Sequence, residues 1–119
     1  MQYMLMIYED ESFYASEEGS AALEQIIAEH QALAGSLGAK LVTGAGLKGP
    51  DTATTIRVNG QARTIHDGPF AESREQLGGY YVVDVPDLDA AIEIARTIPF
   101  GKDGAVEIRP LLEDDGRPD

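Results

Sequence analysis

The sequence predicts an α+β sandwich in which two β-α-β units are separated by an inserted β-hairpin. Three observations indicate this fold class. Short apolar runs near both ends of the chain are typical of buried strands, and two amphipathic stretches have helical periodicity. An Asn59-Gly60 pair lies between two strand-like segments, which is a strong hairpin signal. We expect both helices to cover the same face of one sheet.

The first β-α-β unit spans residues 3–43. Residues 3–8 are continuously apolar and predict a strand buried on both faces, and the polar residues 9–19 predict a loop. A helical stripe then repeats at three- and four-residue steps up to Gly38, which is expected to end the helix. Residues 41–43 follow as the second strand. The stripe consists of Leu23, Ile26, Ile27, His30, Leu33, Ala34 and Leu37.

A glycine-rich segment follows the second strand. Residues 44–49 match a GxGxxG pattern, but a dinucleotide site also requires a helix that begins at this loop and receives the pyrophosphate. Pro50 and a Thr-rich strand follow instead. We therefore interpret the segment as a flexible connector. The hairpin expected next joins residues 53–58 to residues 62–66.

The second β-α-β unit begins after a turn. The turn, Asp67-Gly68-Pro69-Phe70, is expected to insert its last residue into the core. Residues 71–77 can form one helical turn before a strand at 80–85. Asp87 then caps a second amphipathic helix, and residues 105–111 form the last strand. With the first unit, this order predicts a ferredoxin-like βαβ-(β-hairpin)-βαβ sandwich.

Composition indicates one small globular domain. The chain has 119 residues, of which 43% are hydrophobic and 25% are charged, so we expect one domain at 1–112 and an acidic flexible tail at 113–119. The absence of cysteine excludes disulfides, thiol nucleophiles and cysteine-based metal sites. The N-terminus lacks a secretory signal and no apolar run could span a membrane, so we expect a cytoplasmic protein.

The charge of the chain limits its partners. Nine basic and 21 acidic residues give a net charge of −12, and residues 1–39 contain no Lys or Arg. Because nucleic-acid phosphates repel such a surface, we expect no direct nucleic-acid binding. His30 and His66 have no potential ligands at helical or strand spacing, so we expect no metal and no cofactor.

His30 is the one polar residue of the first helical stripe. A buried imidazole needs a hydrogen-bond partner, and the predicted topology offers Asp67 or Glu107. His30 is therefore either a satisfied core histidine or a pocket residue that can act as acid or base near neutral pH. Glu107 and Arg109 share one face of the last strand, where an ion pair, a pocket wall and a solvated surface are all open alternatives.

The strands at 3–8 and 80–85 have little polar alternation, so the sheet face opposite the helices also needs cover. A second copy of the chain can supply it, sheet against sheet. We therefore predict a homodimer.

Residues 66–81 have the sequence HDGPFAESREQLGGYY, which resembles the YCII-related family in its DGPF-domain branch. The resemblance extends to Tyr3–Tyr8, Asp87–Ala91 and Val106–Pro110, and so covers nearly the whole chain. It implies a ferredoxin-like, dimeric α/β-barrel fold.

The same resemblance implies a function. Shorter relatives carry a helix histidine and an aspartate that are proposed as an acid–base pair, and dehydrochlorinase-type chemistry occurs among relatives. We therefore expect a lyase or isomerase for a carbonyl or phenolic compound, with His30 and Asp67 as its catalytic residues: His30 takes a proton, and Asp67 orients the imidazole or holds the substrate. The alternative is a non-catalytic dimeric ligand- or protein-binding module, since DGPF proteins are often encoded beside extracytoplasmic-function sigma factors. The expected ligand contacts are Gly68, Pro69, Phe70, Glu72 and Arg109.

Overall fold

The structure is a computed structural model that describes residues 1–112; the predicted tail at 113–119 lies outside the described residues. No helix in the described part of the chain is both long and apolar enough to cross a membrane. The strands are β1 (Gln2–Glu9), β2 (Leu41–Gly46), β3 (Thr54–Asn59), β4 (Ala62–Asp67), β5 (Gln76–Asp84) and β6 (Gly104–Pro110). The α-helices are α1 (Glu17–Leu37) and α2 (Leu88–Ala95), and the 3-10 helices are η1 (Glu11–Ala15), η2 (Gly38–Lys40) and η3 (Pro50–Thr52).

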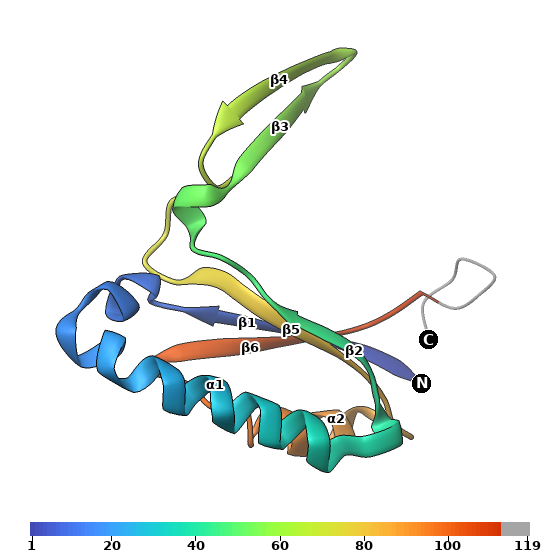
Figure 1. The fold of residues 1–119 in the computed structure, drawn as a ribbon. Helices are drawn as coiled ribbons and strands as arrows, with labels where there is room; N and C mark the ends of the chain where they lie inside the picture. The colour runs from blue at the N-terminus through green and yellow to red at the C-terminus, as the bar shows by residue number, and fades with distance from the viewer. Residues whose placement is uncertain (113–119) are drawn as a thin grey trace.

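One antiparallel four-stranded sheet organises the fold. Its strand order is β2-β5-β1-β6, and both α-helices lie on the same face of it (Figure 1). This arrangement confirms the predicted ferredoxin-like α+β sandwich. Strands β3 and β4 form a separate two-stranded sheet, which stands away from the body on the side opposite the helices (Figure 1). We call this hairpin the arm.

The core lies between the sheet and the helix layer. Alternate residues of β1 and β5 point into it, and Leu5 and Val83 are fully enclosed there. The residues between them, such as Met4 and Met6, are half-buried on the opposite face. Within one chain β1 is therefore buried on one face, not on both as the apolar run predicts. The buried core residues are Tyr3, Leu5, Ile7, Tyr81, Val83, Val85, Ala91 and Ile98.

Helix α1 begins earlier than its apolar stripe. Ser16 caps the helix, because its hydroxyl accepts a hydrogen bond from the Gly19 amide at 3.1 Å. The first helical residue is Glu17, so η1 and the start of α1 replace much of the loop predicted at 9–19. The helix ends at Gly38, whose φ of +55° is in the left-handed region, as predicted.

The glycine-rich segment that starts at Gly44 and residues 71–77 both differ from the structure predicted for them. Gly44 belongs to β2 rather than to a flexible connector, since it pairs with Tyr81 and leaves room for that ring. A Cβ at position 44 would lie 2.8 Å from the Tyr81 Cδ1 atom. Residues 71–77 contain no helical turn, because β5 already begins at Gln76 and pairs with the end of β1.

The predicted turn forms at the base of the arm, but it does not enter the core. Gly68 has a φ of +100°, and its amide donates to the Ala53 carbonyl at 2.8 Å. The Phe70 side chain is 73% exposed, so the prediction that it inserts into the core is wrong. Its ring instead lies under the Arg57 guanidinium, 5.1 Å from the ring centroid.

Replacement of Gly19 by alanine is expected to destabilise the protein, although alanine favours helices. A Cβ at position 19 would lie 1.9 Å from the Phe13 carbonyl oxygen, so η1 and α1 must separate. We expect Gly19→Ala to lower the free energy of unfolding by about 1–3 kcal/mol, measured by urea denaturation.

Gly35→Ala is the matched control on the same helix. Nothing lies within 4 Å of a Cβ at position 35, so this change is expected to raise the free energy of unfolding by about 0.5–1 kcal/mol. Equal stabilisation by Gly19→Ala and Gly35→Ala would contradict the packing of η1 against α1.

Candidate functional site

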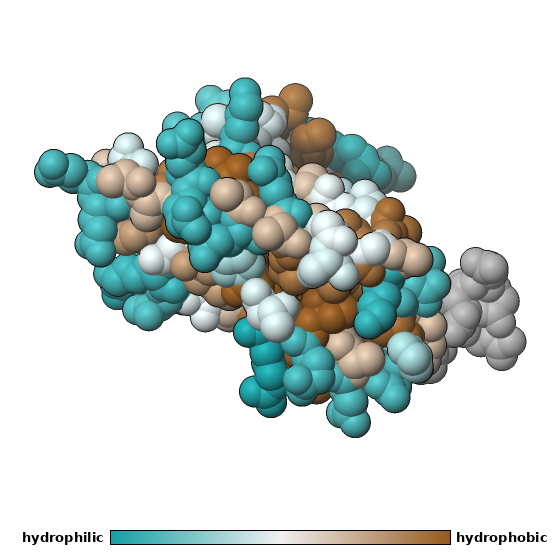
Figure 2. Space-filling view, turned by 60° about the horizontal axis from the view of Figure 1, so that its bottom comes forward, coloured by the Kyte–Doolittle hydropathy of each residue, from teal (hydrophilic) through white to brown (hydrophobic). Residues whose placement is uncertain are grey.

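A pocket of about 850 Å³ lies between α1, the end of β1 with η1, and the edge formed by β2 and β5. We call it the α1 pocket. It is present because the sheet does not cover the whole apolar stripe of α1: Ile26 is buried, whereas Leu23 is 40% and Ile27 is 47% exposed. A space-filling view turned toward the helix layer shows exposed apolar side chains among hydrophilic ones (Figure 2).

His30 lies in the α1 pocket and is half-buried. Its Nδ1 atom lies 2.7 Å from the hydroxyl oxygen of Tyr81 on β5, and the two ring centroids are 6.0 Å apart. Helix α1 therefore positions the imidazole and the sheet positions the phenol. The structure thus gives His30 the polar partner that a buried imidazole requires.

The predicted carboxylate partners of His30 lie elsewhere. Asp67 is exposed at the base of the arm, where β4 ends, and it does not line the α1 pocket. Glu107 lies on the opposite face of the sheet, where its Oε1 atom accepts a hydrogen bond from the Tyr8 hydroxyl at 3.3 Å. Among residues 1–112, the side-chain partner of His30 is the phenol of Tyr81 and not a carboxylate.

The His30–Tyr81 pair combines a neutral base with a protonated phenol. Burial lowers the pKa of His30 below its ordinary value of 6.5. The charge of Glu9, a hydrogen bond with the Pro99 backbone and the charge of Glu29 raise this pKa, but by less. Burial also raises the pKa of Tyr81, so the phenol keeps its proton. At pH 7 the imidazole can therefore accept a proton, which is the property that a general base needs.

Glu9 and Tyr14 form a second polar pair in the α1 pocket. Glu9 is only 8% exposed, and its Oε2 atom accepts a hydrogen bond from the Tyr14 hydroxyl. Burial, together with this bond and the charge of Glu9, raises the pKa of Tyr14 well above its ordinary value.

Sequence patterns did not single out this second pair, because an acidic run at 9–11 indicates the polar end of a strand. The sequence signal for Glu9 is the alternation of side chains along β1, which places Glu9 on the same face as Leu5 and Ile7. Tyr14 has no comparable signal in the sequence. In the described part of the chain, no group of three or more His, Asp or Glu is arranged to hold a metal ion.

The remaining predicted site residues lie outside the α1 pocket. Gly68, Pro69 and Phe70 form the turn at the base of the arm, and Glu72 is exposed in the loop that follows. Arg109 lies on β6, on the sheet face away from the helices. The structure does not bring these residues to His30, and their role in ligand binding stays a prediction.

The family of the chain follows from comparison with known proteins. The model of the YCII-related domain matches residues 1–114. The chain belongs to the YCII-related family. It is also similar to an uncharacterised protein of Rhizobium meliloti (strain 1021), with 36% identity over 121 residues that cover 93% of this chain and 92% of that protein. The predicted family is therefore confirmed, at a level that assigns no substrate.

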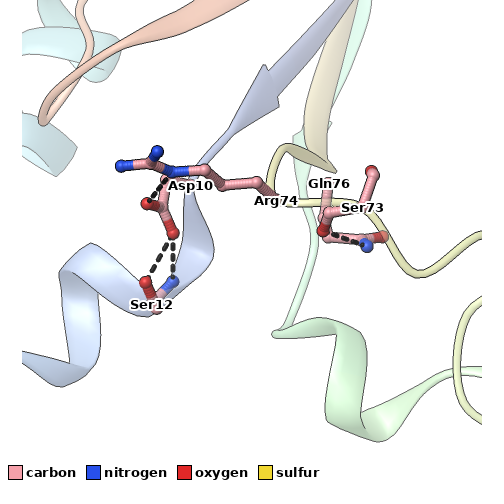
Figure 3. Close-up of polar contacts among 5 residues, drawn as sticks. All are labelled: Asp10, Ser12, Ser73, Arg74 and Gln76. Atoms are coloured by element: carbon pink, nitrogen blue, oxygen red, sulfur yellow. Dashed lines mark hydrogen bonds and ion pairs between the residues drawn. The ribbon is translucent and has the colours of Figure 1, made fainter.

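Arg74 ties the loop before β5 to the rim of the pocket in this YCII-related domain. Its Nε atom lies 3.2 Å from the Asp10 Oδ2 atom, and Asp10 also accepts a hydrogen bond from the Ser12 amide at 3.1 Å (Figure 3). The bonds from Ser12 and then from Arg74 hold the pKa of Asp10 below its usual range. The Gln76 side chain donates to the Ser73 carbonyl at 2.8 Å and stabilises the same loop. Arg74 and Gln76, two polar residues of the motif at 66–81, thus have a structural role.

The depressed pKa of His30 predicts a pH dependence of folding for this YCII-related domain. Just below pH 6.5 the unfolded chain binds more protons than the folded one, so stability is complete above pH 6.5 and is lost as the pH falls through the folded pKa. We expect His30→Gln to reduce this loss in urea titrations, and NMR of the wild type to give a pKa below 6.5. His66→Gln, a change on the arm, should leave the titration of His30 unaltered. A measured pKa of His30 at or above 6.5 would contradict its placement in the α1 pocket.

Proposed function

We propose that this YCII-related domain is a small-molecule enzyme of the lyase or isomerase type, in which His30 takes a proton from a carbonyl or phenolic compound in the α1 pocket. The observation that carries the proposal is the 2.7 Å contact between His30 Nδ1 and the Tyr81 hydroxyl, inside a pocket of about 850 Å³. A neutral imidazole oriented by a second polar group is the usual arrangement of a general base.

In this proposal Tyr81 has the orienting role that we predicted for Asp67. The Tyr81 hydroxyl contacts Nδ1, and a hydrogen bond with the Pro99 backbone holds the ring as well, so the imidazole is oriented by both neighbours. The ring nitrogen that carries no proton is the atom that takes a proton from the substrate. Glu9 and Pro99 favour the imidazolium ion that results, since both raise the pKa of His30.

The reaction can then end in two ways. In an isomerisation, the electron pair left on carbon is delocalised into the carbonyl or ring, and His30 returns the proton to a different atom of the substrate. In an elimination, that electron pair forms a double bond and a leaving group such as chloride departs with its own bonding pair. Both outcomes need one base, and the isomerisation also needs that base to return the proton as an acid; a histidine can do both.

A deuterium-exchange assay tests the proposal before a substrate is known. Small ketones, phenols and chlorinated ring compounds are incubated with the protein in D₂O, and proton NMR follows exchange at carbon or loss of chloride. We expect the wild-type protein to process at least one compound and His30→Ala to lose that activity. Equal activity of the two proteins would overturn the assignment of His30 as the base.

A second candidate is a non-catalytic dimeric module that binds a small ligand or a protein. The exposed position of Asp67, which supplies no carboxylate to His30, favours it. Residues 1–39 contain no Lys or Arg, so their surface suits a basic partner, for example a sigma factor, through a contact that weakens as salt rises. Ligand binding without exchange by the wild-type protein would favour this second function.

We further propose that two copies of the chain form a homodimer that uses the arm and the sheet face away from the helices. Ile56 pairs with Ile65 across the arm, and Val58 lies on the same face; they are 59%, 73% and 57% exposed, respectively. An isolated two-stranded hairpin is marginally stable in water, so this apolar face needs a surface to cover it. Residues 52–66 contain two arginines and no acid, which complements the acidic body of a second copy.

The double variant Ile56→Asp/Ile65→Asp is expected to shift the dimer to monomer by at least about tenfold in dissociation constant, because it places two charges on a covered apolar face. Analytical ultracentrifugation over a concentration series measures the shift. Thr64→Asp puts a charge on the opposite face of the same strand and should leave the dissociation constant unchanged. A wild-type protein that is monomeric at every concentration would overturn the homodimer.

A further inference from the structure

We propose that the α1 pocket selects a compound with a protonated amine on a small apolar or aromatic body, and that Glu9 and Glu11 bind the ammonium group. This inference rests on the proposed function, because it names the substrate class of the same site. Three features of the pocket lead to it: the sign of its charge, an open oxygen on a buried carboxylate, and an apolar wall.

The lining of the α1 pocket is acidic. Glu9, Glu11 and Asp51 line it, whereas no Lys or Arg of residues 1–112 does. His30 does not offset these charges, because burial keeps its imidazole neutral at pH 7. A carboxylate or phosphate ligand would therefore meet charges of its own sign without a cation to bind it.

Glu9 is a buried carboxylate that lacks a cation. It is 8% exposed, and it forms no ion pair with any described residue. Its Oε2 atom accepts from Tyr14, but its Oε1 atom accepts no hydrogen bond within residues 1–112. Since no enclosed side-chain oxygen or nitrogen of those residues lacks a partner, Oε1 is not sealed from solvent, and Glu9 lines the pocket. Buried charges in proteins are normally paired, so a cationic ligand supplies what Glu9 lacks.

Glu11 also favours added positive charge. Burial raises the pKa of its carboxyl, and the charges of Glu9 and Asp10 raise it further. A bound ammonium group would relieve this repulsion. An organic cation fits the site better than a metal ion, because the described residues contain no cluster of three potential ligands. An ammonium group has three N–H donors, so it can donate to more than one carboxylate, and the charge of Glu9 acts on Glu11.

The rest of the pocket determines the body of the ligand. Leu23, Ile26 and Ile27 of α1 form an apolar wall, and the backbone of the glycine-rich ends of β2 and β5 lies across from it. Such a wall suits a ring or a short aliphatic chain. Because the charge of Glu9 acts on the pKa of His30, an amine bound at Glu9 lies within electrostatic reach of the proposed base.

Three probes of similar shape test the charge preference: 2-phenylethylamine, 2-phenylethanol and 3-phenylpropionate. Each is titrated into the ¹⁵N-labelled full chain at pH 7, and amide shifts at the pocket give the dissociation constants. We expect the amine to bind about ten- to a hundredfold more tightly than the carboxylate, with the alcohol between them. Tighter or equal binding of the carboxylate, or no pocket shifts with the amine at millimolar concentration, would overturn the inference.

Variants locate the preference. Glu9→Gln keeps an acceptor for Tyr14 and is expected to reduce the amine-to-carboxylate ratio to about one. Glu11→Gln, at a less buried position, should lower the ratio by a smaller factor and keeps the test informative if Glu9→Gln does not fold. Glu107→Gln removes the same charge from the opposite sheet face and should leave the ratio unchanged. A ratio that is unchanged in the double variant Glu9→Gln/Glu11→Gln would overturn the inference.

The amine test and the test of His30 fail independently. Selective amine binding with undiminished exchange by His30→Ala would overturn the proposed base and leave the ligand class standing. Exchange that depends on His30 with tighter binding of the carboxylate would overturn only the ligand class. Titration with MgCl₂ or ZnCl₂ alone is a third arm: shifts at Glu9 and Glu11 at micromolar metal would assign the carboxylates to a metal ion and overturn the amine.

Discussion

Replacement of His30 by alanine is expected to lower kcat/KM by about 10²–10⁴-fold on the compound that the deuterium-exchange assay identifies. The loss is this large because the described part of the α1 pocket contains no second imidazole and no Lys, and because the pKa of Tyr81 is raised away from neutrality. The measurement is a comparison of steady-state rates, with folding of the variant verified by its urea midpoint.

Two further variants separate catalysis from structure. Tyr81→Phe keeps the ring against Gly44 but removes the hydroxyl that orients His30, so kcat should fall by about tenfold with little change in KM. The wild-type rate should decline as the pH falls through the pKa of His30, which burial places below 6.5, and this decline should be absent from the residual rate of His30→Ala. Glu24→Gln, on the solvent side of α1, is the control and should leave all of these values unchanged. If the rate of His30→Ala declined at low pH in the same way as the wild-type rate, some other group would be the base.

The order of secondary structure could be predicted from the sequence because each element has a local signal. Asn59-Gly60 predicts the arm, and the structure gives Gly60 a φ of +62° in the turn between β3 and β4. Asp87 predicts the start of α2, and its side chain accepts from the Ala90 amide at 2.9 Å. Two β-α-β units with these boundaries leave few ways to build one sheet.

The candidate site could be predicted only in part, because its contacts join residues that are far apart in the sequence. His30 is conspicuous as the polar residue of an apolar stripe, but nothing local indicates that Tyr81, 51 residues away, is its partner. Tyr81 belongs to an apolar strand, where a tyrosine predicts core packing. Its hydroxyl reaches His30 because β5 lies between β1 and β2, and that order is a property of the whole sheet.

The sequence predicts Asp67 as a partner of His30, but in the fold it lies outside the α1 pocket. Its motif is specific, and a turn after the hairpin could have brought it over the sheet. The structure instead places β4 in the arm, where β3 is its one partner among the described strands, and the arm stands apart from the helix layer that holds His30 (Figure 1). A turn motif determines local dihedral angles, whereas the direction of the arm depends on contacts that local sequence does not encode.

The core prediction with the largest expected effect is Leu5→Ala, which should lower the free energy of unfolding by about 2–5 kcal/mol. Leu5 is fully buried in β1, where it pairs with Tyr81 on one side and with Ile108 on the other. Replacement of its isobutyl group by a methyl group leaves a cavity that the two neighbouring strands cannot close, since both are held to β1 by backbone hydrogen bonds. For a domain of this size, whose total stability is about 5–15 kcal/mol, the change is a large fraction.

Urea denaturation measures the effect, and Val42→Ala provides the control on β2. Val42 is 49% exposed, so its truncation should cost no more than about 0.5 kcal/mol. Because Leu5 opposes Tyr81, the cavity also allows the phenol to move away from His30, and the exchange rate per folded molecule should fall together with stability. A loss of stability without any loss of rate would show that α1 positions the imidazole independently of the core beneath Tyr81. A loss below about 1 kcal/mol would mean that the helix layer does not pack on β1 as described.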